Sequence, residues 1–215
     1  MATTEGTHFA QIAEERRALA HVLRSLTPEQ EATQSLCGAW TVHDVIAHLV
    51  VPLVTRTPDL VRALVAGRFN FNGMNQALVR QQSGRTLDDL LDELDRRATS
   101  KFTPPGHDSQ APLTDVKVHG LDITVPLGLD LGRPADTWIP VLAFLTSPRA
   151  ERGFVRRDRP ALRLVASDTD FAWGDGPEVT GPATALTAAL TGRGALDHQL
   201  SGEGLPALLS WQRRG

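Results

Sequence analysis

Apolar residues recur at helical spacing through the first part of this chain, and the pattern then gives way to short alternating runs. In residues 5–26, for example, they return every three or four positions and so share one helix face. After an arginine-rich stretch at 149–160, residues 161–166 partly alternate instead, which favours a strand. The change predicts a mainly α protein, with a helix bundle over residues 1–148 and a small α+β domain over 155–215.

Capping signals and prolines set the expected helix ends. Thr41 stands three residues before Asp44, which is the spacing of a capping box and gives Asp44 a structural role. This box opens a helix expected over 42–66, in which Pro52 and Pro58 predict a bend or break. The other expected helices of the first part are 5–26, 74–82, 87–98, 111–125 and 138–146, with a loop over 69–73. In the second part we expect strands at 161–166 and 171–173 and helices at 182–191 and 205–211.

Two of these helices carry histidines in positions suited to a metal ion. Asp115 and His119 are four residues apart and Asp122 is three further on, so the three lie in one stripe of a helix with ~3.6 residues per turn. His48, on a second helix, would add a third ligand. Two histidines and one carboxylate are typical of catalytic zinc or non-haem iron sites. The same spacing also suits an ordinary solvated pair on one helix, so the residues alone leave both interpretations open.

Composition excludes several classes of function. A formal charge of -3 argues against a nucleic-acid-binding protein, which would carry a basic surface. The sequence has no apolar run near the ~20 residues that span a bilayer, and its first residues lack the apolar core of a signal peptide. Cys37 is the only cysteine, which rules out an internal disulfide and fits a reducing cytoplasm. We expect Cys37 to be a small, partly buried residue rather than a reactive thiol.

Three sequence blocks resemble one known family. Residues 40–49, WTVHDVIAHL, are similar to the W-[ST]-V-x-D-V-x-A-H-L signature of the DinB-like superfamily, and within it of the mycothiol-dependent maleylpyruvate isomerase family. Residues 118–123, followed by Pro-Leu-Gly at 126–128, resemble that family's V-H-x-x-D-I-x-x-P-L-G block. Residues 181–193 and 200–204 are similar to its C-terminal domain. The resemblance implies a DinB-like four-helix bundle with a sterol-carrier-like α+β domain.

The resemblance also assigns roles to individual residues. It implies metal ligation by His48, Asp115 and His119, although the best-studied family pattern has Glu where this chain has the shorter Asp115. Asp122 would orient a ligand imidazole from behind, or it is an ordinary carboxylate near a helix end. Arg193 is the candidate catalytic and cofactor-binding residue, because an anionic substrate needs cationic donors. The alternative for Arg193 is a surface arginine favoured by the dipole of the preceding helix.

The implied function is that of a metal-dependent, mycothiol-using isomerase, with zinc as the favoured metal. In the resembled enzymes a thiolate adds to an activated double bond, the resulting single bond rotates, and the thiol leaves. Two alternatives share the same ligands: a mycothiol S-transferase acting on electrophiles, and a non-catalytic binding or resistance protein. The expected partners are a small thiol and a small anionic or electrophilic substrate, with no nucleic acid or membrane.

The setting implied by the resemblance is a cytoplasmic monomer or homodimer from a mycothiol-making, actinobacterial host. The sequence contains twenty arginines but only two lysines, a bias typical of GC-rich genomes and compatible with that host.

Overall fold

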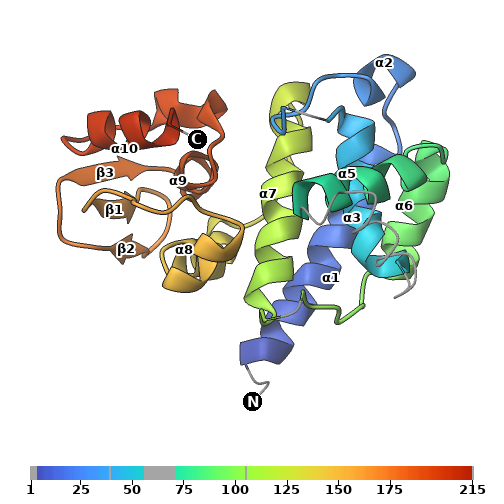
Figure 1. The fold of residues 1–215 in the computed structure, drawn as a ribbon, viewed down its shortest axis with the longest axis horizontal. Helices are drawn as coiled ribbons and strands as arrows, with labels where there is room; N and C mark the ends of the chain where they lie inside the picture. Colours follow the sequence, from blue (N-terminus) through green and yellow to red (C-terminus); the bar gives the residue numbers. More distant parts are fainter. Residues whose placement is uncertain (1–3, 39, 56–70, 105, 215) are drawn as a thin grey trace. The chain divides into compact units, whose positions relative to one another are not determined.

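The computed structural model describes residues 4–38, 40–55, 71–104 and 106–214. The chain is mainly helical with one small three-stranded sheet, which confirms the predicted fold class (Figure 1). It divides into two compact units: the first contains residues 1–102 and 122–131, and the second contains residues 103–121 and 132–215. The predicted domain limits, 1–148 and 155–215, are not tested by this division and stay a prediction.

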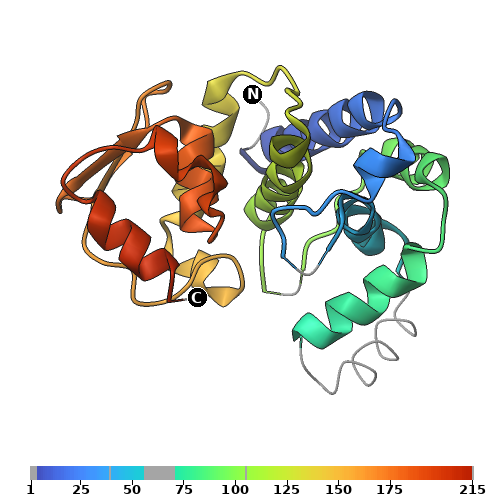
Figure 2. The same cartoon turned by 90° about the horizontal axis from the view of Figure 1, so that it is seen from above.

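Three helices, α1 (Thr4–Leu23), α3 (Val42–Val54) and α6 (Leu87–Arg96), form the centre of the first unit. Helix α6 packs on both α1 and α3, and α5 (Phe71–Gln82) packs on α3 (Figure 1 and Figure 2). Their apolar faces are fully buried and include Ile12, Leu19, Leu23, Val45, Ile46, Leu90, Leu91 and Leu94. The helical spacing of the sequence therefore identifies the core of this unit correctly.

Helix α3 begins at the predicted capping box. The backbone N–H of Asp44 donates to Thr41 Oγ1 (3.2 Å), and the N–H of Thr41 donates to Asp44 Oδ2 (3.1 Å). The helix contains Pro52 and ends at Val54, so the predicted break near the prolines is confirmed. Pro58 and the rest of the expected helix, up to residue 66, fall outside the described residues.

One local prediction was wrong, and one short helix was not expected. Residues 71–73 were expected in a loop but belong to α5, and residues 69–70 lie outside the described part. The connector after α1 contains a short helix, α2 (Pro28–Glu31). Its cause is a second capping box: Thr27 Oγ1 accepts the N–H of Gln30 (3.3 Å), and Gln30 Oε1 accepts the N–H of Thr27 (2.9 Å).

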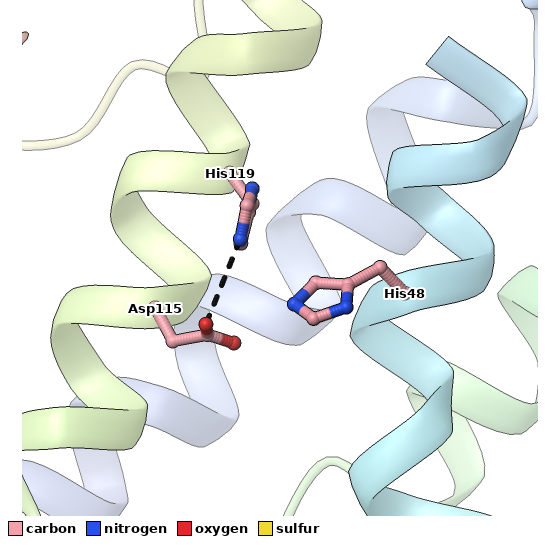
Figure 3. Close-up of side chains that lie close together, drawn as sticks. All are labelled: His48, Asp115 and His119. Atoms are coloured by element: carbon pink, nitrogen blue, oxygen red, sulfur yellow. Dashed lines mark ion pairs between the residues drawn. The ribbon is translucent and has the colours of Figure 1, made fainter. Parts of the chain in front are cut away.

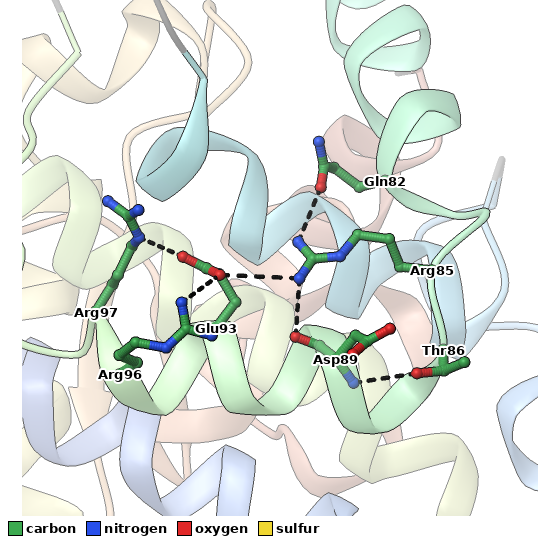
Figure 4. A network of polar contacts seen from close by, with 7 residues as sticks. All are labelled: Gln82, Arg85, Thr86, Asp89, Glu93, Arg96 and Arg97. Atoms are coloured by element: carbon green, nitrogen blue, oxygen red, sulfur yellow. Dashed lines mark hydrogen bonds and ion pairs between the residues drawn. The ribbon is translucent and has the colours of Figure 1, made fainter.

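A cluster of charged side chains surrounds Glu93 near the C-terminal end of α6 (Figure 4). The Glu93 side chain, only 8% exposed, accepts hydrogen bonds from Arg97 and from Arg96 (2.8 Å). Arg85 Nη2 lies 3.8 Å from Glu93 Oε2. Arg85 also donates to the backbone carbonyl of Asp89 (3.1 Å). Burial raises the pKa of Glu93, but the hydrogen bonds and charges of Arg97 and Arg96 outweigh it and hold the pKa below its usual value. The folded state therefore favours the ionised form of the Glu93 carboxylate.

The second unit is built on a sheet of order β2-β1-β3. Strand β1 (Arg163–Ala166) pairs antiparallel with β2 (Ala172–Trp173) and parallel with β3 (Glu178–Gly181), so that Leu164 lies opposite both Trp173 and Val179. The sequence predicted β1 and β2 but missed β3. The other elements of the second unit are η1 (Ala135–Trp138), α8 (Ile139–Leu145), η2 (Pro148–Arg152), α9 (Ala183–Leu190), η3 (Gly194–Gln199) and α10 (Leu205–Gln212).

Helix α9 packs against β1, β3, α8 and α10. Its start has no side-chain cap of its own, because Pro182 occupies the N-cap position. Asp168, in the turn after β1, supplies the missing acceptor: its Oδ1 receives the N–H of Ala183 (2.9 Å). The helix ends before Gly192, whose φ of 81° suits glycine, and Arg193 follows directly.

Helix α7 (Gln110–Leu127) carries two of the candidate ligands. The division between the units falls within this helix, since residues up to 121 belong to the second unit and those from 122 to the first. The loop before α3 is tied to its second half, because the N–H of Leu36 donates to the carbonyl of Asp122 (3.1 Å).

Candidate metal centre

His48 on α3 and the pair Asp115 and His119 on α7 point toward one another (Figure 3). Each of the three offers a ligand atom, and these atoms all lie within 4.8 Å of one another. Asp115 Oδ1 and His119 Nε2 are 3.6 Å apart. The His119 side chain is 12% exposed and that of Asp115 is 32% exposed, so the group is partly shielded but open to a small ligand.

Helix geometry explains why these side chains meet. Asp115 and His119 are one turn apart on α7, which places both on one face. His48 lies in the second turn of α3, and the start of that helix is fixed by the capping box at Thr41. The remaining question is whether the group suits a metal ion.

The donor set and its dimensions fit a divalent metal. Two imidazole nitrogens and one carboxylate oxygen are typical ligands of catalytic zinc, with one position left for water or substrate. Ligand atoms at zinc-bond length around a tetrahedral ion are about 3.4 Å apart. The Asp115–His119 separation of 3.6 Å is close to this value, and the 4.8 Å limit requires only a small inward movement of side chains. That these residues hold a metal stays a prediction.

Asp122 lies on the same helix and is completely buried. A carboxylate in such a position is costly unless hydrogen bonds or charges stabilise it, which fits a defined structural role. Its position three residues after His119 is compatible with orienting a ligand imidazole. This role stays a prediction.

Arg193 follows α9 in the second unit and is partly buried. Its Nη1 donates to the backbone carbonyl of Thr191 (2.6 Å), at the C-terminal end of α9. This contact is the one expected for an arginine that satisfies the carbonyls of a helix end. The catalytic and cofactor-binding role of Arg193 stays a prediction.

A cavity of about 230 Å³ lies near the same end of α9. None of the candidate ligands lines it, and neither does Arg193, although the neighbouring Gly192 does. Its walls are mostly apolar and are formed by Phe154, Arg156, Leu190, Thr191, Gly192, Trp211 and Gln212. We therefore base the candidate site on the side-chain chemistry of α3 and α7 and not on this cavity.

His43, the other histidine of α3, takes no part in the group. Its Nδ1 lies 2.9 Å from Glu31 Oε2, and its Nε2 lies 3.2 Å from the carbonyl oxygen of Ser83. These contacts link α3 to α2 and to the residue after α5.

Trp40 is the neighbour that sequence reasoning missed. Its indole lies against the imidazole of His48, with ring centroids 4.8 Å apart and planes inclined at 31°. The two residues are eight positions apart in one motif, but that spacing alone does not predict a ring contact.

The helices and the two-histidine, one-carboxylate group define a mainly helical protein with a candidate metal site and a small sheet-containing part. The family model described as "Mycothiol maleylpyruvate isomerase N-terminal domain" matches residues 12–124, more than half of the chain. The chain belongs to this family, as the three sequence blocks indicated. No curated protein matches the chain.

Two solved structures are similar over nearly the whole length. One is the crystal structure of the mycothiol-dependent maleylpyruvate isomerase, and the other is a histidine-to-alanine mutant of it. Each is 14% identical and has a TM-score of 0.61, covering 94% of this chain and 93% of the other. At this identity the similarity establishes the shared fold. Among the described residues, no helix has the length and apolar character needed to span a membrane.

Proposed function

We propose that this chain is a metal-dependent, mycothiol-using enzyme of the maleylpyruvate isomerase type. The observation that carries the proposal is the convergence of His48, Asp115 and His119 within 4.8 Å. Family membership supports the thiol, because the family and the two similar structures are named for mycothiol. We favour zinc, since its preferred ligands are those present.

Each residue of the site has a definite task in this proposal. His48 and His119 provide neutral nitrogen ligands, and Asp115 provides an anionic oxygen that offsets part of the metal charge. A divalent metal held there would lower the pKa of a coordinated thiol or water, making a nucleophile at neutral pH. Asp122 restrains an imidazole from the side away from the metal, and Arg193 pairs with a carboxylate of the substrate.

The proposed reaction is a cis–trans isomerisation of an activated double bond. A carbon–sulfur bond forms as the double bond becomes single, rotation follows, and the same carbon–sulfur bond breaks as the double bond returns. Substrate and product therefore have the same composition, and the thiol is regenerated. This balance distinguishes an isomerase from an S-transferase, in which the thiol is consumed.

The test measures zinc per chain and the isomerisation of maleylpyruvate with and without added mycothiol. We expect His48→Ala to lose both the metal and the activity. His43→Gln is the matched control, because it alters a histidine of the same helix that lies outside the group. We expect it to keep both.

The outcomes separate the proposed function from its alternatives. A wild-type chain that takes up no metal, or one that is equally active without thiol, contradicts the proposal. Stoichiometric loss of mycothiol to an electrophile would identify an S-transferase. Binding of metal and thiol without turnover would identify a binding or resistance protein.

A further inference from the structure

We propose that Trp40 is a positioning residue that holds the imidazole of His48 in the orientation required for metal binding. The inference rests on the proposed metal site and adds a residue that does not itself offer a ligand atom. It is carried by the ring contact between Trp40 and His48 and by the hydrogen bonds that fix the backbone of Trp40.

The contact restrains the His48 ring. The ring centroids are 4.8 Å apart and the planes are inclined at 31°, so the two rings are in tilted contact. This separation is within the range in which aromatic rings attract each other. An imidazole in contact with an indole has less freedom to rotate about its side-chain bonds.

The backbone of Trp40 is itself held firmly. Its carbonyl oxygen accepts hydrogen bonds from the N–H of Ser35 (3.2 Å), from Ser35 Oγ (2.7 Å) and from Gln34 Nε2 (2.8 Å). Its own N–H donates to the carbonyl of Cys37 (2.8 Å). Ser35 is buried and its side-chain bond to this carbonyl is partly shielded from water, whereas the bond from Gln34 is exposed. The indole is therefore attached to a fixed point of the fold.

The segment that carries Trp40 is also tied to the helices on either side. The N–H of Val42, the first residue of α3, donates to the carbonyl of Thr33 (2.9 Å). The N–H of Leu36 donates to the carbonyl of Asp122 on α7 (3.1 Å). Trp40 is thus placed relative to the start of α3, the helix that also carries His48.

His48 has a particular need for such support. Asp115 and His119 are neighbours on α7, 3.6 Å apart, and can restrain each other. His48 is the member of the group that comes from α3, where no second ligand accompanies it. Restraining a ligand ring before the metal arrives reduces the ordering that binding must impose. Partners that orient a metal ligand typically contribute ~10–100-fold to metal affinity.

Three substitutions of Trp40 separate positioning from packing. Trp40→Phe keeps an aromatic face against His48, Trp40→Leu keeps apolar bulk without that face, and Trp40→Ala removes both. Zinc affinity is measured by competition with a chromophoric chelator, and stability by thermal unfolding of the metal-free protein. We expect affinity close to wild type for Phe and ~10–100-fold weaker binding for Leu and Ala. Metal-free stability should remain close to wild type for Phe and Leu.

Trp173→Leu is the matched control. Trp173 is 36% exposed on β2 and lies 4.4 Å from the Arg159 guanidinium, in the second unit. Replacing it should leave zinc affinity unchanged. A further readout needs no metal: the His48 ring-proton resonances should shift when the indole is removed, because its ring current is lost.

The possible results are distinguishable. Equal zinc affinity for the wild type and Trp40→Leu overturns the role of Trp40 but leaves the proposed function standing. Parallel loss of affinity and metal-free stability in the Phe and Leu variants shows a purely structural role and also overturns the inference. A wild-type chain that binds no zinc overturns the proposed function and this inference together.

Discussion

Asp115 and Asp122 are carboxylates on one stripe of α7, but they differ in their surroundings. The Asp115 side chain is 32% exposed and lies 3.6 Å from His119, whereas Asp122 is completely buried. A partly exposed carboxylate beside an imidazole can give its oxygen to an ion, whereas a buried one acts through neighbouring groups. The two residues should therefore affect metal binding to different degrees.

The first prediction ranks three variants by zinc affinity. His119→Ala should weaken binding most, Asp115→Asn less, and Asp122→Asn least, with a loss of ~10–100-fold for Asp122→Asn. The reason is that the first two lose a direct ligand or its charge. Thermal unfolding of each metal-free variant controls for misfolding, since Asp122 is buried. If Asp122→Asn is the most damaging, the roles of the two carboxylates are reversed.

The second prediction concerns Glu93 and acid. Because the folded pKa of Glu93 is lowered from 4.5, its contribution is present above pH 4.5 and is lost as the pH falls below that value. Glu93→Gln should destabilise the protein by about 1–3 kcal/mol at pH 7. The difference from wild type should shrink in acid, as measured by urea unfolding at several pH values.

Glu178→Gln is the control for Glu93→Gln. Glu178 is 53% exposed and its carboxylate lies 3.6 Å from Arg163, so the pair is a surface pair that contributes little. A difference between Glu93→Gln and wild type that persists unchanged in acid would show that the charge of Glu93 is not the cause.

At the scale of single residues, the sequence predicts those relations between side chains that the geometry of one helix determines. The one-turn spacing of Asp115 and His119 predicted their shared face, and the structure has it. Spacing could not show that His48 meets them, because that depends on the packing of distant helices; the residues offered His48 as a third ligand, and the family resemblance assigned it that role. The Trp40 contact was missed because it depends on the hydrogen bonds of Gln34, Ser35 and Cys37.

Among the elements, α3 and α6 allow a matched test of helix capping. Thr41 caps α3 by accepting the N–H of Asp44, and Thr86 caps α6 by accepting the N–H of Asp89, both at 3.2 Å. The third prediction is that Thr41→Ala and Thr86→Ala each cost about 1 kcal/mol of stability. Only Thr41→Ala should also weaken zinc binding, because α3 carries His48.

Chemical denaturation and zinc competition, applied to both variants, check this prediction. A zinc affinity of Thr41→Ala equal to that of the wild type would show that the start of α3 does not control the position of His48. Equal losses of zinc affinity in Thr41→Ala and Thr86→Ala would point instead to a general effect of lower stability.

The elements that the sequence missed depend on tertiary contacts. Strand β3 has no alternating pattern strong enough to identify it, and its hydrogen-bonded register comes from parallel pairing with β1. The short helix α2 has a local cause, the capping box at Thr27 and Gln30, and could have been recognised. Helix α1, which has clear periodicity, and helix α6, which also has a cap at Thr86, were predicted well.

For the molecule as a whole, the fourth prediction is that function requires a thiol from outside the chain. Cys37 is the only internal thiol. Its backbone carbonyl accepts hydrogen bonds from the N–H of Trp40 and from Ser35 Oγ in the loop that carries Trp40. Cys37→Ala keeps those backbone bonds, so it should retain nearly full mycothiol-dependent activity. His48→Ala should have none. An inactive but folded and metal-loaded Cys37→Ala protein would contradict the use of an external thiol.

Helix α9 has a consequence for how this scaffold can be changed. All its residues except Thr184 are buried, and four of them are alanines with at most 1% exposure: Ala183, Ala185, Ala188 and Ala189. Larger side chains at such positions typically cost 1–3 kcal/mol. In a saturation library screened for soluble protein, α9 should accept the narrowest range of amino acids. Laboratory evolution toward a new substrate would therefore have to work around this helix, and variation would accumulate at exposed positions elsewhere.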